Sequence, residues 1–245
     1  MIRAWLLRRY GKLLSFLVSQ LDEINVLAVL IRVVENTVDK NPANEGLRFL
    51  LETDSQLYPI QSSTAIRYEL EAHPKHRLTD YHDFFLNNVA LGERVIDVGC
   101  GKGSVAYDLA KNSRARVLGI DINQASIAVA QKTYQHKDLR FRAGDALKLN
   151  TVELFDTVVL SNVLEHIVDR VMFLKKLINV TGATKFLIRV PTYERDWRIP
   201  LKRELGVDWR LDNDHKTEFT ISSFSEEIKH AGLDIVNFNV QWVEI

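Results

Sequence analysis

Residues 95–103, Val-Ile-Asp-Val-Gly-Cys-Gly-Lys-Gly, constrain the fold of this chain more than any other segment. An apolar run that predicts a buried strand leads directly into a glycine-rich turn, and a helical pattern follows from Ser104. Glycine is needed where a ligand lies against the backbone, because a Cβ would block its approach. The segment therefore predicts a strand–turn–helix unit that binds a nucleotide-like ligand.

Downstream of residue 90, short β-branched runs alternate with helical patterns. Strands are predicted at residues 94–98, 116–121, 139–143, 157–161, 185–190 and 233–241, with helices at 104–111, 124–134, 170–180 and 222–230. Continuous apolar strands such as residues 157–160 indicate a parallel sheet covered on both faces. The predicted fold class is α/β, with a doubly wound, mostly parallel sheet.

Three carboxylates narrow the choice of ligand. Asp97 stands two residues before Gly99, where it would repel a pyrophosphate but could hold an ammonium group. A dinucleotide motif would have its third glycine at the position of Ser104. Asp121 ends the second strand, where a carboxylate can accept both ribose hydroxyls, and Asp145 follows the third strand, within reach of an adenine. The pattern favours S-adenosylmethionine (SAM), which has an ammonium and no phosphate.

This ordered set resembles the catalytic core of the class I SAM-dependent methyltransferases over residues 94–191, with a Rossmann-like fold. The likeness is to small-molecule enzymes of the ubiquinone O-methyltransferase type. The stretch from Arg189 to Thr220 is also similar to methyltransferases of bacterial sugar and surface-polysaccharide pathways. The resemblance implies SAM as cofactor and a set of cofactor-binding residues: Asp97, Gly99, Cys100, Gly101, Gly103, Asp121, Ile122, Asp145, Ala146, Ser161 and Asn162.

The segment Ser161–His166 follows the fourth strand and, by the resemblance, faces the acceptor. The candidate catalytic residues are His166, Glu165 and the distant His215. His166 suits a general base because the pKa of imidazole lies near neutrality; alternatively, Glu165 and His166 only shape the pocket. Some sugar-hydroxyl methyltransferases combine an acidic residue, Glu-His and a later His into a divalent-metal site. Here Asn162 stands where that pattern has Glu, so we favour a site without metal.

Two polar segments accompany this core. Residues 192–219 form a long connection rich in charge and aromatics, which predicts either an acceptor-binding loop or a solvated excursion. Residues 73–82 contain His73, His76 and His82 together with Arg77 and Tyr81. We interpret them as a polar lid over the donor site, since their spacing matches no compact metal-binding pattern.

Residues 1–90 predict a helical extension, broken near Asn41-Pro42, at residues 58–63 and at His73-Pro74, and residues 91–245 the SAM-binding domain. The usual last strand of such a domain is either missing or supplied by another segment. The first helix is predicted to be amphipathic. Its apolar residues recur close to the helical period: Ile2, Trp5, Leu6, Leu13, Phe16, Leu17, Leu21 and Ile24. It would dock on its own domain, on a second subunit in a homodimer, or less favourably on a membrane surface.

Composition limits the partners and the location. The chain has 32 basic and 32 acidic residues, so we expect no nucleic-acid partner. Cys100 is the only cysteine, which fits the reducing cytoplasm where we expect the protein. We predict O-methylation of a small polar acceptor, most simply a sugar hydroxyl. N-methylation, methylation of a lipid-linked quinone precursor, and a non-catalytic SAM-binding scaffold remain as alternatives.

Overall fold

The computed structural model describes residues 2–69, 73–149, 154–212 and 214–240. The chain divides into two compact units. One consists of Met1–Ser63 with Leu201–Asp208, and the other of Thr64–Pro200 with Trp209–Ile245. The second unit contains the sheet and all of the candidate site residues, whereas the first is helical.

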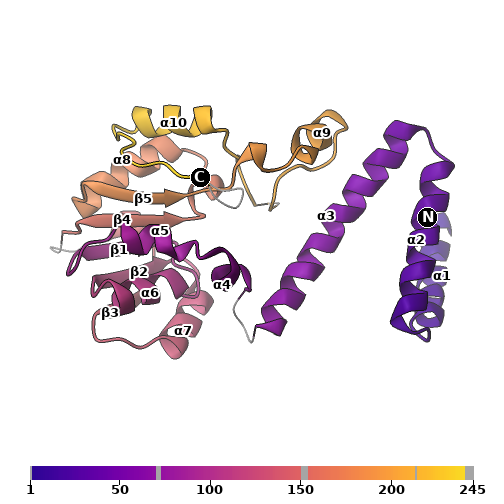
Figure 1. Cartoon of the computed structure of the whole chain (residues 1–245), viewed down its shortest axis with the longest axis horizontal. Helices are drawn as coiled ribbons and strands as arrows, with labels where there is room; N and C mark the ends of the chain where they lie inside the picture. The colour runs from indigo at the N-terminus through magenta and orange to yellow at the C-terminus, as the bar shows by residue number, and fades with distance from the viewer. Residues whose placement is uncertain (1, 70–72, 150–153, 213, 241–245) are drawn as a thin grey trace. The chain divides into compact units, whose positions relative to one another are not determined.

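The sheet has five parallel strands in the order β3-β2-β1-β4-β5. Their bounds are β1 Arg94–Val98, β2 Arg116–Asp121, β3 Leu139–Ala143, β4 Thr157–Ser161 and β5 Lys185–Arg189. Five of the six predicted strands are thus confirmed, as is the doubly wound α/β fold (Figure 1). The chain order reverses between β1 and β4, and ligands of such sheets bind at the carboxyl ends of the strands beside this reversal.

Alternate residues of the central strands enter two separate cores. Ile96, Val158 and Leu160 pack on one face of the sheet, against α8 (Arg170–Thr181) and α10 (Ile221–His230). Val95 and Val159 pack on the other face. That face is covered by α5 (His82–Asn87), α6 (Ser104–Asn112) and α7 (Gln124–Thr133) (Figure 1). Both faces are apolar because both are buried, which explains the continuous apolar runs in the sequence.

Side-chain caps fix where several helices begin. The Asn123 side chain accepts hydrogen bonds from the first turn of α7, and Asp169 caps α8 in the same way. Thr220 and Ser223 form a reciprocal capping box at the start of α10. These caps satisfy backbone N–H groups that have no partner within the helix. The helices predicted around 104–111, 124–134, 170–180 and 222–230 are confirmed to within two residues, although α6 begins after Gly103 without a side-chain cap.

The predicted strand at residues 233–241 is wrong over 233–240, which form no strand; Gln241 lies outside the described residues. An amphipathic strand forms when one of its faces is buried. Here Val236 is 95% exposed, and Phe238 and Val240 are also exposed. Residues 233–239 instead line a hollow of about 430 Å³ beside β5, which Tyr81 and Arg189 also line.

The helical unit contains α1 (Ile2–Val18), α2 (Glu23–Asp39) and α3 (Ala43–Tyr68) as far as Ser63, together with Leu201–Glu204 of α9 (Arg198–Glu204). The break near Asn41-Pro42 is confirmed. The break predicted at residues 58–63 is wrong, since α3 continues through Pro59. Proline removes one backbone donor, and the rest of this 26-residue helix keeps its ladder. The side chains of Ile2, Trp5 and Leu6 lie outside the described residues, but Leu13, Phe16, Leu17, Leu21 and Ile24 are exposed.

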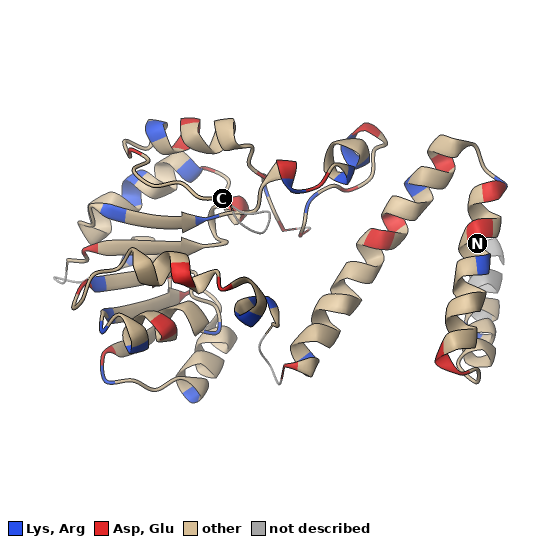
Figure 2. Cartoon of the chain, in the orientation of Figure 1, with Lys and Arg blue, Asp and Glu red and all other residues tan. Residues whose placement is uncertain are grey.

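No described helix is long and apolar enough to span a lipid bilayer. Figure 2 shows Lys and Arg on the same helices as Asp and Glu, for example on α3. The short α4 (Lys75–Thr79), which Pro74 precedes directly, begins where the sequence predicted a break.

Candidate functional site

The glycine-rich loop joins β1 to α6 at the carboxyl edge of the sheet. The N–H groups of Gly99 and Cys100 donate to the carbonyl of Ile120, at 2.8 and 3.2 Å, and so tie the loop to β2. A Cβ on Gly103 would lie 2.4 Å from Phe141, so this glycine allows α6 to pack on β3. Gly101 has a φ of +53° and nothing within 4 Å of where its Cβ would stand. The loop is therefore pressed against the sheet on one side and open at Gly101.

Asp97 is a buried carboxylate with an unsatisfied oxygen. Its side chain is at the end of β1, and among the described residues its Oδ2 has no hydrogen-bond partner. Burial, reinforced by the charge of Asp121, raises the pKa of Asp97 to about 7, although the backbone N–H of Ala106 favours the charged form. Such a group is costly without a partner. The position fits a ligand that brings a cation, such as the ammonium group of SAM.

Asp121 anchors the loop from the end of β2. Its Oδ2 accepts a hydrogen bond from Gly101 N–H at 2.8 Å, and its Oδ1 accepts one from Asn123 N–H at 2.7 Å. Each carboxylate oxygen can accept a second bond, so both remain able to receive ribose hydroxyls. Ile122, the next residue, is 82% exposed and presents an apolar surface beside them.

The turn after β3 adds the third predicted carboxylate. Gly144 N–H donates to the carbonyl of Asp121 at 2.8 Å, which brings this turn beside the end of β2. Asp145 accepts a hydrogen bond from Leu147 N–H at 2.9 Å, and Ala146 is buried beneath it. Asp97, Asp121 and Asp145 thus stand at one edge of the sheet, as their positions after successive strands predict.

Cys100 is the remaining side chain of the glycine loop. Burial raises the pKa of its thiol, and the charges of Asp97 and Asp121 raise it further. The thiol stays protonated at neutral pH and is unsuited to nucleophilic chemistry. Cys100 therefore remains a candidate cofactor-binding residue through its backbone in the glycine loop, and not through its thiol.

The segment after β4 packs directly on the glycine loop. A Cβ on Gly99 would lie 2.7 Å from the Cγ2 of Val163, so these two residues are in close contact. Asn162, which follows Ser161 at the end of β4, has a φ of +56°. Its Oδ1 accepts a hydrogen bond from Arg189 at 2.6 Å. The oxygen that a metal would need is therefore engaged by a guanidinium, and Asn162 is not available as a ligand in this arrangement.

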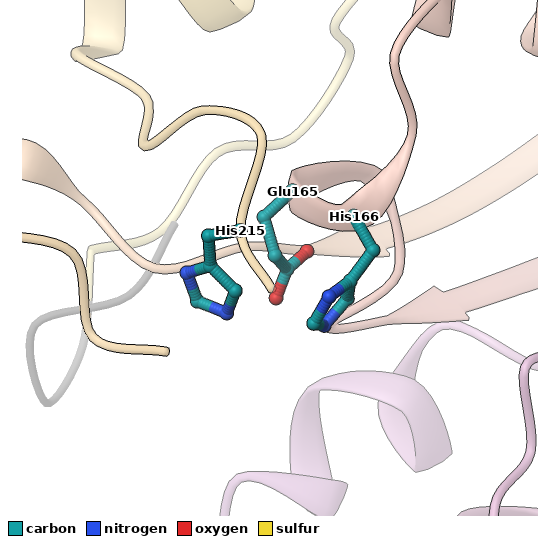
Figure 3. A group of neighbouring side chains, drawn as sticks. All are labelled: Glu165, His166 and His215. Atoms are coloured by element: carbon teal, nitrogen blue, oxygen red, sulfur yellow. The ribbon is translucent and has the colours of Figure 1, made fainter. Parts of the chain in front are cut away.

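Glu165, His166 and His215 lie together although 50 residues separate the first two from the third (Figure 3). Each offers a ligand atom, and these atoms all lie within 4.8 Å of one another. The two imidazole rings meet edge to face with centroids 4.8 Å apart. Glu165 is 1% exposed and His215 4% exposed, whereas about a third of the His166 side chain reaches solvent. Burial raises the pKa of the Glu165 carboxyl, while hydrogen bonds, one of them with the Asn162 side chain, and the neighbouring histidines oppose this shift.

Backbone hydrogen bonds hold the distant loop in this place. The N–H groups of Lys216 and Thr217 both donate to the carbonyl of Glu165, at 2.7 and 3.3 Å. His215 Nδ1 lies 3.3 Å from Glu218 Oε1, and Glu218 also pairs with Arg195. Burial opposes the charge of Glu218, but the hydrogen bonds from His215 and Arg195 outweigh it and lower the pKa. The residue types of Glu218 and Arg195 could have suggested this support, but their partners could not be deduced from the sequence.

Arg189 is another site residue that the sequence did not single out. It ends β5, donates to Asn162, and lies over the ring of Tyr81 at 3.7 Å from the centroid. The predicted lid segment is thus tied to the carboxyl edge of the sheet. In the same segment His76 lies 3.2 Å from His82, and burial lowers the pKa of His76 to about 4, helped by the charge of His82.

The other polar residues of this segment have structural partners. His82 Nδ1 lies 2.5 Å from the Asp108 carboxylate on α6. Arg77 pairs instead with Glu69 near the exposed surface. Of the two residues, Tyr81 is therefore in contact with the site, through Arg189, whereas Arg77 pairs with a residue that is not part of the site.

Comparisons with known proteins agree with this architecture. Residues 91–204 match a family model described as a methyltransferase domain. A ubiquinone biosynthesis O-methyltransferase from Bradyrhizobium diazoefficiens is 32% identical over 122 residues, which cover 49% of this chain and 47% of that protein. A 2-methyl-6-phytyl-1,4-hydroquinone methyltransferase from Synechocystis is 28% identical over 158 residues, 60% of this chain and 48% of the relative. The chain thus spans about half the length of these curated relatives.

The fold is also that of a solved methyltransferase. The crystal structure of magnesium protoporphyrin IX methyltransferase from Synechocystis, with bound S-adenosylhomocysteine (SAH), matches with a TM-score of 0.54 at 18% identity. The match covers 66% of this chain and 76% of that one. Together with the buried Asp97, the open glycine loop and Asp121, these likenesses confirm the resemblance noted in the sequence. Residues 91–204 thus form a methyltransferase domain, with the fold of the class I SAM-dependent methyltransferases.

Proposed function

We propose that this protein transfers a methyl group from SAM to a hydroxyl oxygen of a small polar acceptor, such as a sugar. The observation that carries the proposal is the Glu165–His166–His215 cluster. It follows β4 and is joined to the glycine loop through the contact between Val163 and Gly99. A group able to accept a proton thus lies next to the donor loop, where an alcohol would have to be activated.

The donor side of the site is built from residues at the ends of β1, β2 and β3. Asp97 would hold the ammonium group and Asp121 the ribose hydroxyls, with Ile122 against the adenine and Asp145 at its edge. When bound, SAM supplies a methyl group on a sulfonium sulfur and leaves as SAH. The protein's own contribution is to align the two reactants and to exclude water.

On the acceptor side, His166 is the exposed member of the cluster. Asp214 Oδ2 lies 3.3 Å from its Nδ1. A neutral His166 would accept the proton that the hydroxyl loses, as its oxygen bonds to the methyl carbon. The ring pair Tyr193–Trp209, with centroids 5.3 Å apart, belongs to the same excursion of the chain and offers aromatic faces for a sugar ring.

The test is an SAH-release assay on the purified protein with a panel of acceptors: nucleotide sugars, free sugars, catechols, quinone precursors and amines. We expect turnover with a hydroxylated acceptor and an O-methyl product by mass spectrometry. H166Q should lower kcat by about 100-fold or more if the imidazole takes the proton. H230Q is the matched control, because His230 is an exposed histidine on α10. An N-methyl product, or full activity of H166Q on the best acceptor, would refute the proposal.

A lipid-linked quinone precursor is the second candidate acceptor. Two observations favour it: the names of the two relatives, and the exposed apolar side chains of α1 and α2, including Leu13, Phe16 and Ile24. Such a helix would rest on an anionic membrane surface. In vesicle flotation, F16E should abolish binding if this candidate is correct. No flotation of the unaltered protein would count against it, and a dimer in light scattering would instead assign these helices to a subunit interface.

We propose the cytoplasm as the place of either activity, since a single cysteine, Cys100, fits a reducing compartment.

A further inference from the structure

Arg189 ends β5 and reaches across to the residue that follows β4. One of its guanidinium nitrogens donates a hydrogen bond of 2.6 Å to Oδ1 of Asn162. The backbone repeats this connection, because the N–H of Asn162 donates to the Arg189 carbonyl at 2.9 Å. A hydrogen bond from a charged donor is stronger than one between neutral groups. Side chain and backbone together therefore hold Asn162 against the end of β5.

Asn162 adopts an unusual backbone conformation at the start of the acceptor segment, Ser161–His166. Its φ of +56° lies in the left-handed region, which is unfavourable for a residue with a Cβ, although Asn tolerates it better than most. The direction of the following residues depends on this turn. Val163 contacts Gly99 of the glycine loop, and His166 ends the 3₁₀ turn that comes next. Whatever holds Asn162 in this conformation therefore also positions the rest of the acceptor segment.

Three aromatic side chains support Arg189 from the predicted lid segment. The guanidinium lies over the ring of Tyr81, 3.7 Å from its centroid. That ring meets the ring of His82 edge to face with centroids 4.4 Å apart, and its hydroxyl lies 3.1 Å from Nδ1 of His76. We call Tyr81, His76 and His82 the aromatic brace. Tyr81 and His82 are buried, and the attraction between a cation and an aromatic face is larger where water is excluded. The aromatic brace thus restricts the movement of the guanidinium.

The aromatic brace is itself fixed to the helix that the glycine loop opens. Nδ1 of His82 lies 2.5 Å from Oδ2 of Asp108, which belongs to α6. The contacts therefore form a closed ring. It runs from the glycine loop through α6, the aromatic brace and Arg189 to the acceptor segment, and it returns through the contact of Val163 with Gly99. In a closed ring no member can move without displacing its neighbours on both sides.

We propose that Arg189 is a positioning residue for methyl transfer. It holds Asn162 in the left-handed conformation and so keeps the acceptor segment aligned with the donor loop. The aromatic brace keeps Arg189 in place, so residues 76–82 support the site in addition to covering it. Methyl transfer requires the nucleophile in line with the sulfonium carbon, and a misplacement of about 1 Å can lower the rate about 100-fold. The inference rests on the methyltransferase domain and applies to an oxygen or a nitrogen acceptor alike.

The experiment compares R189Q, N162G and the double variant R189Q/N162G with the wild type. Hydrogen exchange of the backbone amides of residues 162–167, followed by mass spectrometry, reports on the acceptor segment without any acceptor. R189Q should speed this exchange about tenfold or more, while the amides of α7 exchange as in the wild type. Glycine adopts a positive φ without cost, and N162G also removes the oxygen that Arg189 binds. R189Q should therefore have no further effect in the N162G background.

Two more readouts separate positioning from binding and folding. With an acceptor, R189Q should lower kcat about tenfold or more. SAH affinity in calorimetry should stay within about threefold of the wild type, because the proposed donor contacts lie at the ends of β1, β2 and β3. R140Q is the matched control, since Arg140 is exposed on β3, and it should change neither exchange nor kcat. R189K keeps the charge but loses the planar fork, so it should give a smaller effect, and it replaces R189Q if that variant does not fold.

Variants of Tyr81 test the aromatic brace. Y81L removes the ring under the guanidinium and should speed exchange of residues 162–167 as R189Q does, whereas Y81F keeps the ring and should have a smaller effect. Unchanged exchange in R189Q overturns the proposal. An effect of R189Q that persists in the N162G background also overturns it, because the arginine would then not act through Asn162. So does a loss of SAH affinity as large as the loss of kcat. An N-methyl product would refute the proposed O-methylation and leave this inference standing.

Discussion

Replacing Asp97 with Asn tests whether the donor site holds a charge that is unfavourable until the donor binds. Asp97 is buried, and its Oδ2 has no hydrogen-bond partner in the part of the chain that the structure describes. Burial first, and then the charge of Asp121, raises its pKa from 3.8 to about 7. The folded chain therefore holds a proton on Asp97 between about pH 4 and pH 7 that the unfolded chain has lost. It follows that this carboxyl makes the protein less stable as the pH rises through that range.

The size of the effect follows from the pKa. A carboxyl whose pKa is 7 rather than 3.8 is less favourable in its charged form by about 4 kcal/mol. Asn carries no charge and keeps the shape. We therefore expect the free energy of unfolding of D97N, relative to the wild type, to rise by up to about 4 kcal/mol from pH 4 to pH 7 and then to stay level. SAM affinity should fall by about 1.5–3 kcal/mol, because a charged hydrogen bond to the ammonium is lost.

The assay is urea unfolding followed by circular dichroism from pH 4.5 to pH 8 without donor, together with calorimetry of SAM binding. In the wild type, affinity should increase up to about pH 7 and decline above about pH 8, as the α-amino group of SAM loses its proton. D156N is the control. Arg94 lowers the pKa of the exposed Asp156, so this variant should not gain stability with pH or lose affinity. Equal pH dependence in D97N and the wild type, or equal SAM affinity, would show that Asp97 does not act in this way.

Three other substitutions test the rest of the structure. D121A should weaken SAM binding by about 1–3 kcal/mol in calorimetry, through lost bonds to ribose and to the Gly101 N–H; unchanged affinity would exclude Asp121 from the site. G101A and G92A both place a side chain at positive φ with open space around it, so each should lose about 1 kcal/mol in urea unfolding. Only G101A should also impair SAM binding, and an equal effect of both would be contrary to the proposed loop. R170A removes a two-bond ion pair, 2.6 and 2.7 Å, that joins α8 to Glu227 of α10. It should cost about 1–3 kcal/mol in unfolding without changing SAM affinity, and a loss of affinity would show that the effect reaches the donor loop.

The strands and the donor residues could be predicted because their signals are local. Each central strand is buried on both faces, so its residues are apolar in succession and their type is visible without knowing the partner. Asp97, Asp121 and Asp145 directly follow or end successive strands, and parallel strands bring these ends to one edge. The chain order of the elements was therefore enough to assemble the donor side.

The sequence-based predictions that proved wrong concern segments whose secondary structure depends on contacts with the rest of the fold. Residues 233–240 alternate in polarity as a strand does, but most of their apolar side chains are exposed, Val236 most of all, and the segment stays irregular. Pro59 reads as a helix break, yet α3 continues because one lost hydrogen bond is small beside the rest of the helix. Local patterns state what a segment can form, and the neighbours in space determine whether it does.

On the acceptor side, too, the sequence identified the residue types and the tertiary structure determined their contacts. The residues Glu165, His166 and His215 could be selected by type, but the sequence by itself favoured a site without metal. The tertiary structure placed Asn162 against Arg189, supported His215 with Glu218, and buried Glu165 beside both histidines. These facts depend on backbone hydrogen bonds between segments about 50 residues apart. Contacts at that separation leave no periodic trace in one sequence, because each residue type is compatible with many partners, and only folding selects one.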